Sequence, residues 1–294
     1  MCMALRDAAA PLAASALWGG MYVVSKWVFV AVPAVTLAFL RVAVGGVALY
    51  AVLRARGAIP QLSSRDRRAV LRLGLWVALT LSTQFVGTDR TNASQGSLLT
   101  MLTPVFTLVL GVTMLDERLT ARSVTGMVLA GAGTVLVVAG QYGLALAGAD
   151  SIGLLALLVA SAAWAAYTVD GARLVRKHGA LLAATYSALA ATPMLAVPAA
   201  AELALTDASV TITPGAVAAV AYLGLASTAA AWWLWYRGVE ESTTTVVAAT
   251  FFAQPLVGAA LGAALLGERL GPWFVAGGVL MAVGVGLVST ARAR

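Results

Sequence analysis

Long apolar runs, separated by short polar, glycine or proline breaks, make up most of this chain. A helix needs about 20 apolar residues to cross the hydrocarbon core of a bilayer, and the runs reach that length. The pattern therefore predicts an all-α membrane protein with ten transmembrane helices. The predicted spans are 8–30, 34–53, 69–88, 92–115, 121–140, 151–172, 180–203, 214–236, 242–266 and 272–290.

Two parts of the chain resemble each other. Residues 93–119 match residues 244–270, with Pro104 aligned on Pro255 and a Glu-Arg-Leu triplet at the end of each stretch. An odd number of predicted spans separates equivalent positions, so the second copy must enter the membrane from the opposite side. Two similar units of opposite orientation are typical of secondary transporters.

The repeat and the basic residues together predict the topology. We expect two five-helix units, residues 1–145 and 146–294. Lys and Arg gather in alternate predicted loops, whereas the loops at 141–150 and 204–213 contain neither. Because basic residues favour the cytoplasmic side, this bias places both termini in the cytoplasm.

Composition supports the membrane class and excludes others. Apolar residues form 61% of the chain and charged residues 11%, against about 25% charged residues in soluble domains. The net charge of +7 does not indicate nucleic acid, because the basic residues form no stripe with aromatic residues. The single cysteine, Cys2, allows no internal disulfide and no metal cluster. We expect membrane lipid and a small-molecule substrate as partners, no cofactor, and a monomer.

Sequence motifs of membrane enzymes are missing. The chain has no Walker A sequence, no His-Glu-x-x-His and no nucleophile elbow, so we do not expect an ATPase or a hydrolase. No Asp or Glu lies near the middle of a predicted span, which disfavours an exchanger built on a central titrating carboxylate. The only histidine, His178, falls in a predicted cytoplasmic loop, where we expect it to be solvated.

The fourth and ninth predicted spans each contain a proline near mid-length, Pro104 and Pro255. Proline removes one helical hydrogen bond, and the freed carbonyl needs a protein or water partner inside a bilayer. One such kink could serve packing alone. Two at matching positions of an inverted repeat favour hinges beside a cavity.

Polar residues collect on the third, fourth and ninth predicted spans. Those on the fourth follow the spacing of one helical face. Hydroxyls inside a membrane can bond to their own helix or to a neighbouring helix, but an amide such as Gln84 or Gln254 must find stronger partners. The substrate-binding candidates on these spans are Gln84, Asn92, Thr100, Thr103, Thr250 and Gln254.

Aromatic residues add a second set of candidates. Trp18 and Tyr22 share a face of the first span, and Trp164 and Tyr167 share a face of the sixth. These tryptophans lie too deep to be headgroup anchors, so we expect them to line a cavity. Trp232 belongs to a cluster at the end of the eighth span that includes interfacial residues, and it is also a candidate for the site.

Arg41 is a charge inside the second predicted span. Such a charge should face protein or water, because lipid does not solvate it. It could pair with a substrate carboxylate. Alternatively, it could snorkel outward or hold carbonyls at a helix end.

Two glutamates, Glu117 and Glu268, come just before the fifth and tenth spans. We expect them to cap those helices or to pair with the adjacent Arg118 and Arg269, because carboxylates are stabilised near helix N-termini.

These residues carry a family resemblance. Trp18-Gly19, the run from Pro104 to Asp116-Glu117-Arg118-Leu119, and the run from Pro255 to Gly267-Glu268-Arg269-Leu270 look like the EamA repeat of the drug/metabolite transporter superfamily. The resemblance implies two inverted five-helix units around a central cavity, with the fifth and tenth helices peripheral. It also implies a carrier of the bacterial cytoplasmic (inner) membrane, often an exporter of amino acids.

Within the superfamily, Trp164-Ala165-Ala166-Tyr167 resembles the sixth span of YddG-type aromatic amino-acid exporters. Those exporters carry an aromatic residue before the fourth-span proline, where this chain has Thr103. The difference argues for smaller or more polar amino acids.

The leading hypothesis is an amino-acid exporter that works by alternating access. A multidrug, purine or sugar carrier on the same scaffold is an alternative, although small multidrug carriers use a carboxylate in the first helix and residues 8–30 contain none. A membrane scaffold without transport is a further alternative, but it leaves the paired prolines and polar faces unexplained.

Overall fold

The computed structural model describes residues 2–57, 62–115, 120–142, 151–241, 250 and 253–289. All the regular elements within these residues are helices. Their order is α1 (Cys2–Val28), α2 (Ala34–Ala55), α3 (Ser64–Arg90), α4 (Ala93–Leu99), η1 (Thr100–Leu102), α5 (Thr103–Leu115), α6 (Ala121–Tyr142), α7 (Ser151–His178), α8 (Ala180–Leu205), α9 (Pro214–Ala221), η2 (Tyr222–Ala230), α10 (Ala231–Glu241), α12 (Ala253–Leu266) and α13 (Pro272–Ser289).

The all-α membrane fold is confirmed. The fourth predicted span consists of α4, η1 and α5, and the eighth of α9, η2 and α10. The first part of the ninth lies mostly outside the described residues. The segments long and apolar enough to cross a membrane are Ala34–Ala55, Ser64–Arg90, Ser151–His178, Ala180–Leu205 and Pro214–Trp235, with shorter apolar helices at Ala121–Val137, Ala253–Leu266 and Pro272–Leu287.

Local sequence signals set several helix starts. The Ser63 side chain accepts a hydrogen bond from the backbone N–H three residues on and caps α3. Thr213 does the same for α9, whose first residue is Pro214. Both are preferred residues at these positions. Gly179 adopts a φ of 83°, which lets the chain reverse tightly between α7 and α8.

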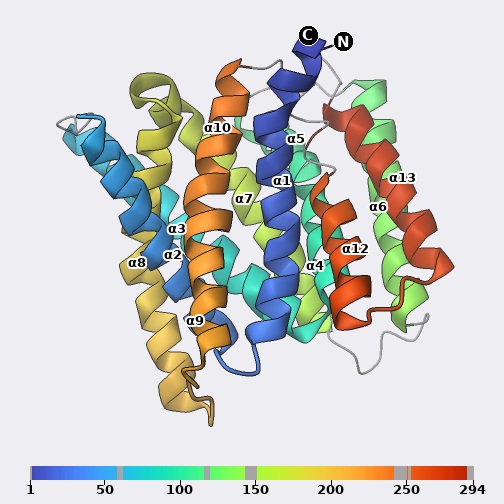
Figure 1. Cartoon of the computed structure of the whole chain (residues 1–294). Helices are drawn as coiled ribbons and strands as arrows, with labels where there is room; N and C mark the ends of the chain where they lie inside the picture. Colours follow the sequence, from blue (N-terminus) through green and yellow to red (C-terminus); the bar gives the residue numbers. More distant parts are fainter. Residues whose placement is uncertain are drawn as a thin grey trace.

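Helices from the two halves of the chain pack against each other. Helix α1 contacts α10 and α12, α3 contacts α7, α2 contacts α8, and α6 contacts α13. Figure 1 shows α6 and α13 side by side at one edge of the bundle, and it places both termini at the same end. We call this the terminal end and the opposite one the far end. The halves therefore interlock and do not form two separate domains.

Small residues allow this close approach. A Cβ atom added to Gly19 of α1 would lie 2.5 Å from the carbonyl oxygen of Gln254 in α12. One added to Gly133 of α6 would lie 2.6 Å from the carbonyl oxygen of Gly277 in α13. In lipid, where apolar burial gives helices little reason to associate, such packing contacts hold the bundle together.

At the far end, two carboxylates of the second half form hydrogen bonds with helices of the first half. Glu202 of α8 accepts hydrogen bonds from the backbone N–H groups of Val35 (3.1 Å) and Thr36 (2.7 Å) and from the Thr36 hydroxyl (2.8 Å). Glu268 accepts from the N–H groups of Ala93 (2.7 Å) and Ser94 (2.9 Å) and from the Ser94 hydroxyl. Each carboxylate therefore accepts hydrogen bonds from N–H groups that have no partner within their own helix, at the N-terminus of a helix in the first half.

The prediction that Glu268 caps the tenth span or pairs with Arg269 is wrong. Gly267 has a φ of 68°, and the chain turns there so that the Glu268 N–H bonds to the Gly262 carbonyl. The Glu268 side chain consequently meets the start of α4. Glu117 and Arg118 lie outside the described residues.

Ion pairs join α3 and α7 at the terminal end. Lys177 donates to the Asp66 carboxylate at 2.6 Å, and His178 Nε2 lies 3.2 Å from it. Arg72 and Asp170 form another pair along the same two helices. The prediction that His178 is solvated is wrong, because its side chain is only 12% exposed. Helix α7 continues to His178, past the predicted end of the span, and so carries the imidazole onto α3.

Candidate functional site

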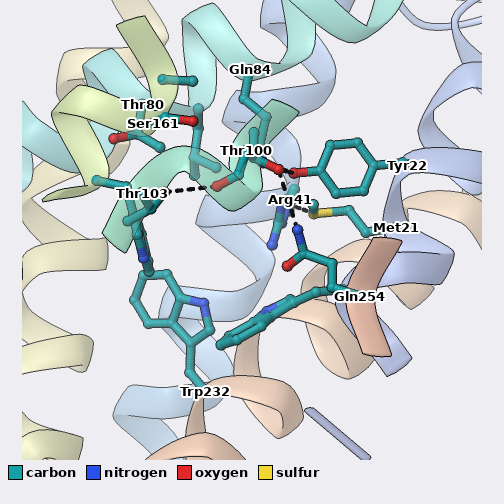
Figure 2. Close-up of a pocket in the computed structure, with 14 residues that line it drawn as sticks. Met21, Tyr22, Arg41, Thr80, Gln84, Thr100, Thr103, Ser161, Trp232 and Gln254 are labelled. Carbon is teal, nitrogen blue, oxygen red and sulfur yellow. Dashed lines mark hydrogen bonds between the residues drawn. The ribbon is translucent and has the colours of Figure 1, made fainter. Parts of the chain in front are cut away.

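A cavity lies inside the bundle, lined by side chains from both halves of the chain (Figure 2). Most of the lining residues are buried, and polar groups are concentrated among them. The lining residues are Trp18, Met21, Tyr22, Arg41, Thr80, Leu81, Gln84, Thr100, Thr103, Ala160, Ser161, Trp164, Trp232 and Gln254.

The structure brings most of the sequence candidates together here. Those that line the cavity are Trp18, Tyr22, Arg41, Gln84, Thr100, Thr103, Trp164, Trp232 and Gln254. Sequence reasoning left Thr80 and Ser161 out of the candidate set, although Thr80 lies one helical turn before Gln84. Met21, an apolar residue in an apolar helix, gave no signal.

Four side chains from four elements form one hydrogen-bond network. The Tyr22 hydroxyl lies 2.6 Å from the Thr100 hydroxyl, and Gln84 donates its Nε2 to Tyr22. Gln254 donates its Nε2 to Thr100 at 3.2 Å. Both glutamines thereby find the partners that a buried amide requires, and the network connects α1, α3, η1 and α12.

The fourth span breaks where this network meets Pro104. Because Pro104 has no N–H, the Thr100 carbonyl loses its usual helical partner. The backbone N–H of Thr103 and, at 2.9 Å, the Thr103 hydroxyl donate to it. Beside this 3₁₀ turn, at Thr100–Leu102, the Leu99 carbonyl accepts a hydrogen bond from the Ser161 hydroxyl of α7 at 3.2 Å. Pro255 is the third residue of α12 as described. The hinge role of both prolines stays a prediction.

Aromatic rings form another wall. The Trp164 ring centroid lies 4.9 Å from that of Tyr167 and 5.8 Å from that of Trp232. Trp18 donates its Nε1 to the Ser227 carbonyl at 3.0 Å. Tyr167 does not line the cavity; it stacks on Trp164, and its hydroxyl lies 3.2 Å from the Ser187 hydroxyl.

Arg41 is 2% exposed, so the prediction that it snorkels outward is wrong. Its Nε donates to the Thr228 hydroxyl at 2.7 Å, and its Nη2 donates to the Ser227 carbonyl at 3.1 Å. The carbonyl alternative is therefore correct in part, although Ser227 lies inside the π-helix η2 and not at a helix end. The wider turns of a π-helix change which carbonyls remain available.

Two candidates lie elsewhere. Asn92 accepts from the Gln95 N–H at 2.8 Å and caps α4 at the far end, so the structure does not bring it to the cavity. Thr250 is buried but does not line the cavity. Over the described ranges, no group of three or more His, Cys, Asp or Glu residues could hold a metal ion.

Comparison with known proteins identifies a family, relatives and a solved structure that resemble this chain. The model of the EamA-like transporter family matches residues 8–139 and, separately, residues 151–290. Two proteins of Archaeoglobus fulgidus, each named an uncharacterized transporter, are 26% and 27% identical over 94% and 93% of this chain and 95% and 93% of their own. A protein crystal structure superposes with a TM-score of 0.68 at 20% identity, covering 98% of this chain and 97% of that one; this similarity shows the fold alone.

Proposed function

The chain belongs to the EamA-like transporter family, and we propose that it exports amino acids or related small metabolites by alternating access. It is a multi-pass membrane transporter for a small-molecule substrate and not an enzyme. The observation that carries the proposal is the cavity, where polar groups from both halves converge inside an apolar bundle. Buried polar groups at the interface between repeats are where carriers bind substrates.

In this proposal the two units, residues 1–145 and 146–294, rock about the cavity and open it to one side at a time. The family model matches the chain twice, once in each unit, which supports that division. Pro104 and Pro255 serve as hinges, because the broken helix at Pro104 already borders the cavity through Thr103.

The cavity walls suit an amino acid of modest size. Gln84 and Gln254 offer carboxamide oxygens to polar groups, because their described hydrogen bonds use Nε2. Trp164 and Trp232 offer apolar faces. Thr103 takes less room beside Pro104 than an aromatic residue would. Asn92, Tyr167 and Thr250 lie outside the lining, so we no longer assign them to substrate contact.

The proposed location is the bacterial cytoplasmic (inner) membrane, with both termini in the cytoplasm. The positive-inside rule supports it, because Lys and Arg concentrate at the terminal end. Arg54, Arg56, Arg176 and Lys177 all lie on helix ends there. We propose a monomer, since one chain supplies every wall of the cavity.

The test is counterflow uptake into liposomes that contain the purified protein. A panel of labelled alanine, threonine, glutamine, glutamate and phenylalanine would be compared with a sugar, a purine and a cationic dye. We expect saturable exchange of some amino acids and none of the contrast compounds. Exchange of a contrast alone would overturn the substrate class, and no exchange of any compound would overturn transport by this protein under these conditions.

A further inference from the structure

The guanidinium of Arg41 is only partly bonded by the protein. A guanidinium carries five N–H donors and no acceptor. Three neutral groups accept from it: the Thr228 hydroxyl, the Ser227 carbonyl and the Met21 thioether. A thioether is a weak acceptor. The described residues thus leave two N–H groups without an acceptor, and Arg41 lines the cavity, where a bound molecule could accept from them.

The positive charge of Arg41 has no protein counter-ion among the described residues. The ion pairs of the described chain join Arg72 to Asp170, and Lys177 and His178 to Asp66, all at the terminal end. Arg41 is also the single charged residue among those that line the cavity. A buried cation without a nearby anion is costly, because neutral dipoles replace the lost hydration only in part.

A second polar group in the cavity lining is also unsatisfied. Thr80 is 4% exposed, and its hydroxyl has no hydrogen-bond partner among the residues that the structure describes. Buried hydroxyls are nearly always bonded, so an exception needs a reason. In the view of Figure 2, Thr80 appears on the same side of the cavity as Ser161 and away from Arg41. A molecule with polar groups at two ends can reach both residues.

We propose that the carried substrate has a net charge of −1 and that Arg41 selects it. The inference rests on the proposed transport function and sharpens its substrate class: acidic amino acids and comparable carboxylates are preferred over zwitterions of the same size. One carboxylate takes the two free N–H groups of Arg41, and the bound complex is then neutral. Thr80 donates to an oxygen at the other end of the molecule.

Net charge distinguishes acidic amino acids from neutral amino acids as substrates for this cavity. A zwitterion also carries a carboxylate, but its ammonium group cancels that charge, so the positive charge of Arg41 stays uncompensated in the bound state. The lining contains no Asp or Glu to compensate that charge. At membrane depth an uncompensated charge is costly. A substrate with net negative charge avoids this cost.

Glutamate and glutamine form the matched probe pair, because they share size and shape and differ by one charge. Counterflow rates of both would be measured in the same liposomes. We expect the wild type to prefer glutamate by about tenfold, since a tenfold preference requires only about 1.4 kcal/mol of difference in binding. Equal rates, or a preference for glutamine, would overturn the inference while leaving the transport function intact.

The Arg41→Gln variant assigns the preference to this residue, with Arg54→Gln as the control. Arg54 lies on the same helix but is exposed. We expect the glutamate-to-glutamine ratio to fall to about one in Arg41→Gln and to persist in Arg54→Gln. The ratio does not depend on how much protein folds. A ratio unchanged in Arg41→Gln would overturn the role of Arg41, and if that variant carries neither amino acid, the wild-type ratio decides the charge proposal. Absence of exchange of any panel compound by the wild type would instead refute the transport function.

Discussion

The far end and the central cavity both hold polar groups inside an apolar bundle, but the protein satisfies them to different degrees. At the far end, Glu202 and Glu268 each accept two backbone N–H groups and one hydroxyl. In the cavity, the described residues offer Arg41 only neutral acceptors and offer the Thr80 hydroxyl no partner. Complete bonding indicates a structural role and incomplete bonding indicates a binding role, because unsatisfied buried groups are costly to keep.

The largest expected effect comes from removing a wall of the cavity. Trp164 packs against both Tyr167 and Trp232, so Trp164→Ala should open the aromatic wall and remove the apolar contact with the substrate. We expect counterflow to be abolished while the protein still reaches the membrane in normal amount. Trp273→Ala is the control, since Trp273 is 57% exposed on α13. Unchanged transport by the Trp164 variant would remove that residue from the site.

The next effect should appear in stability and not in selectivity. Glu268→Ala leaves the N–H groups of Ala93 and Ser94 without their carboxylate, and each unsatisfied group costs about 1–3 kcal/mol. We expect a clearly lower unfolding temperature in detergent, measured by intrinsic tryptophan fluorescence. Any transport that remains should keep its preference among amino acids. A changed preference with normal stability would contradict the distinction between the two regions.

Glu202→Ala provides a parallel test of the far end. Its carboxylate also accepts hydrogen bonds from two backbone N–H groups and one hydroxyl, but these belong to α2. A similar loss of stability is expected, because the exposed groups are equivalent. A loss for Glu268 alone would mean that the start of α4, and not carboxylate capping in general, limits stability.

Removing one hydroxyl from the cavity network should have an intermediate effect. Thr100→Val keeps the shape of the side chain but takes a partner from Tyr22 and Gln254. We expect the KM for an exchanged amino acid to rise about tenfold, since one unsatisfied polar group costs about 1–3 kcal/mol. Thr192→Val is the control, because Thr192 bonds only to its own helix at the Ala188 carbonyl. Equal KM values for both variants would indicate that the hydrogen-bond network serves helix packing and not substrate binding.

The sequence predicted the helices well because span length and apolar composition act locally. It also identified the cavity residues that carry a polar or aromatic side chain at helical spacing, such as Gln84 and Trp164. It failed where a partner lies far away in the chain. Nothing near Glu268 indicated that its carboxylate would reach α4. Asn92 was expected in the site, although its side chain caps α4. The π-helix η2, which presents the Ser227 carbonyl to Arg41, has no recognisable sequence signal.

The smallest effect should come from the exposed ion pair at the terminal end, which belongs to neither kind of polar region. The Arg72 side chain is 59% exposed, so water competes for the charge and the bond to Asp170 contributes little. A double-mutant cycle with Arg72→Ala and Asp170→Ala should give a coupling energy of about 0.2–1 kcal/mol, with transport unchanged. If the coupling energy were much larger, or if transport fell, we would infer that this ion pair holds α3 and α7 together during the transport cycle. The terminal end would then have a structural role like that of the far end. The burial of a charged group would no longer tell a structural region from an exposed one.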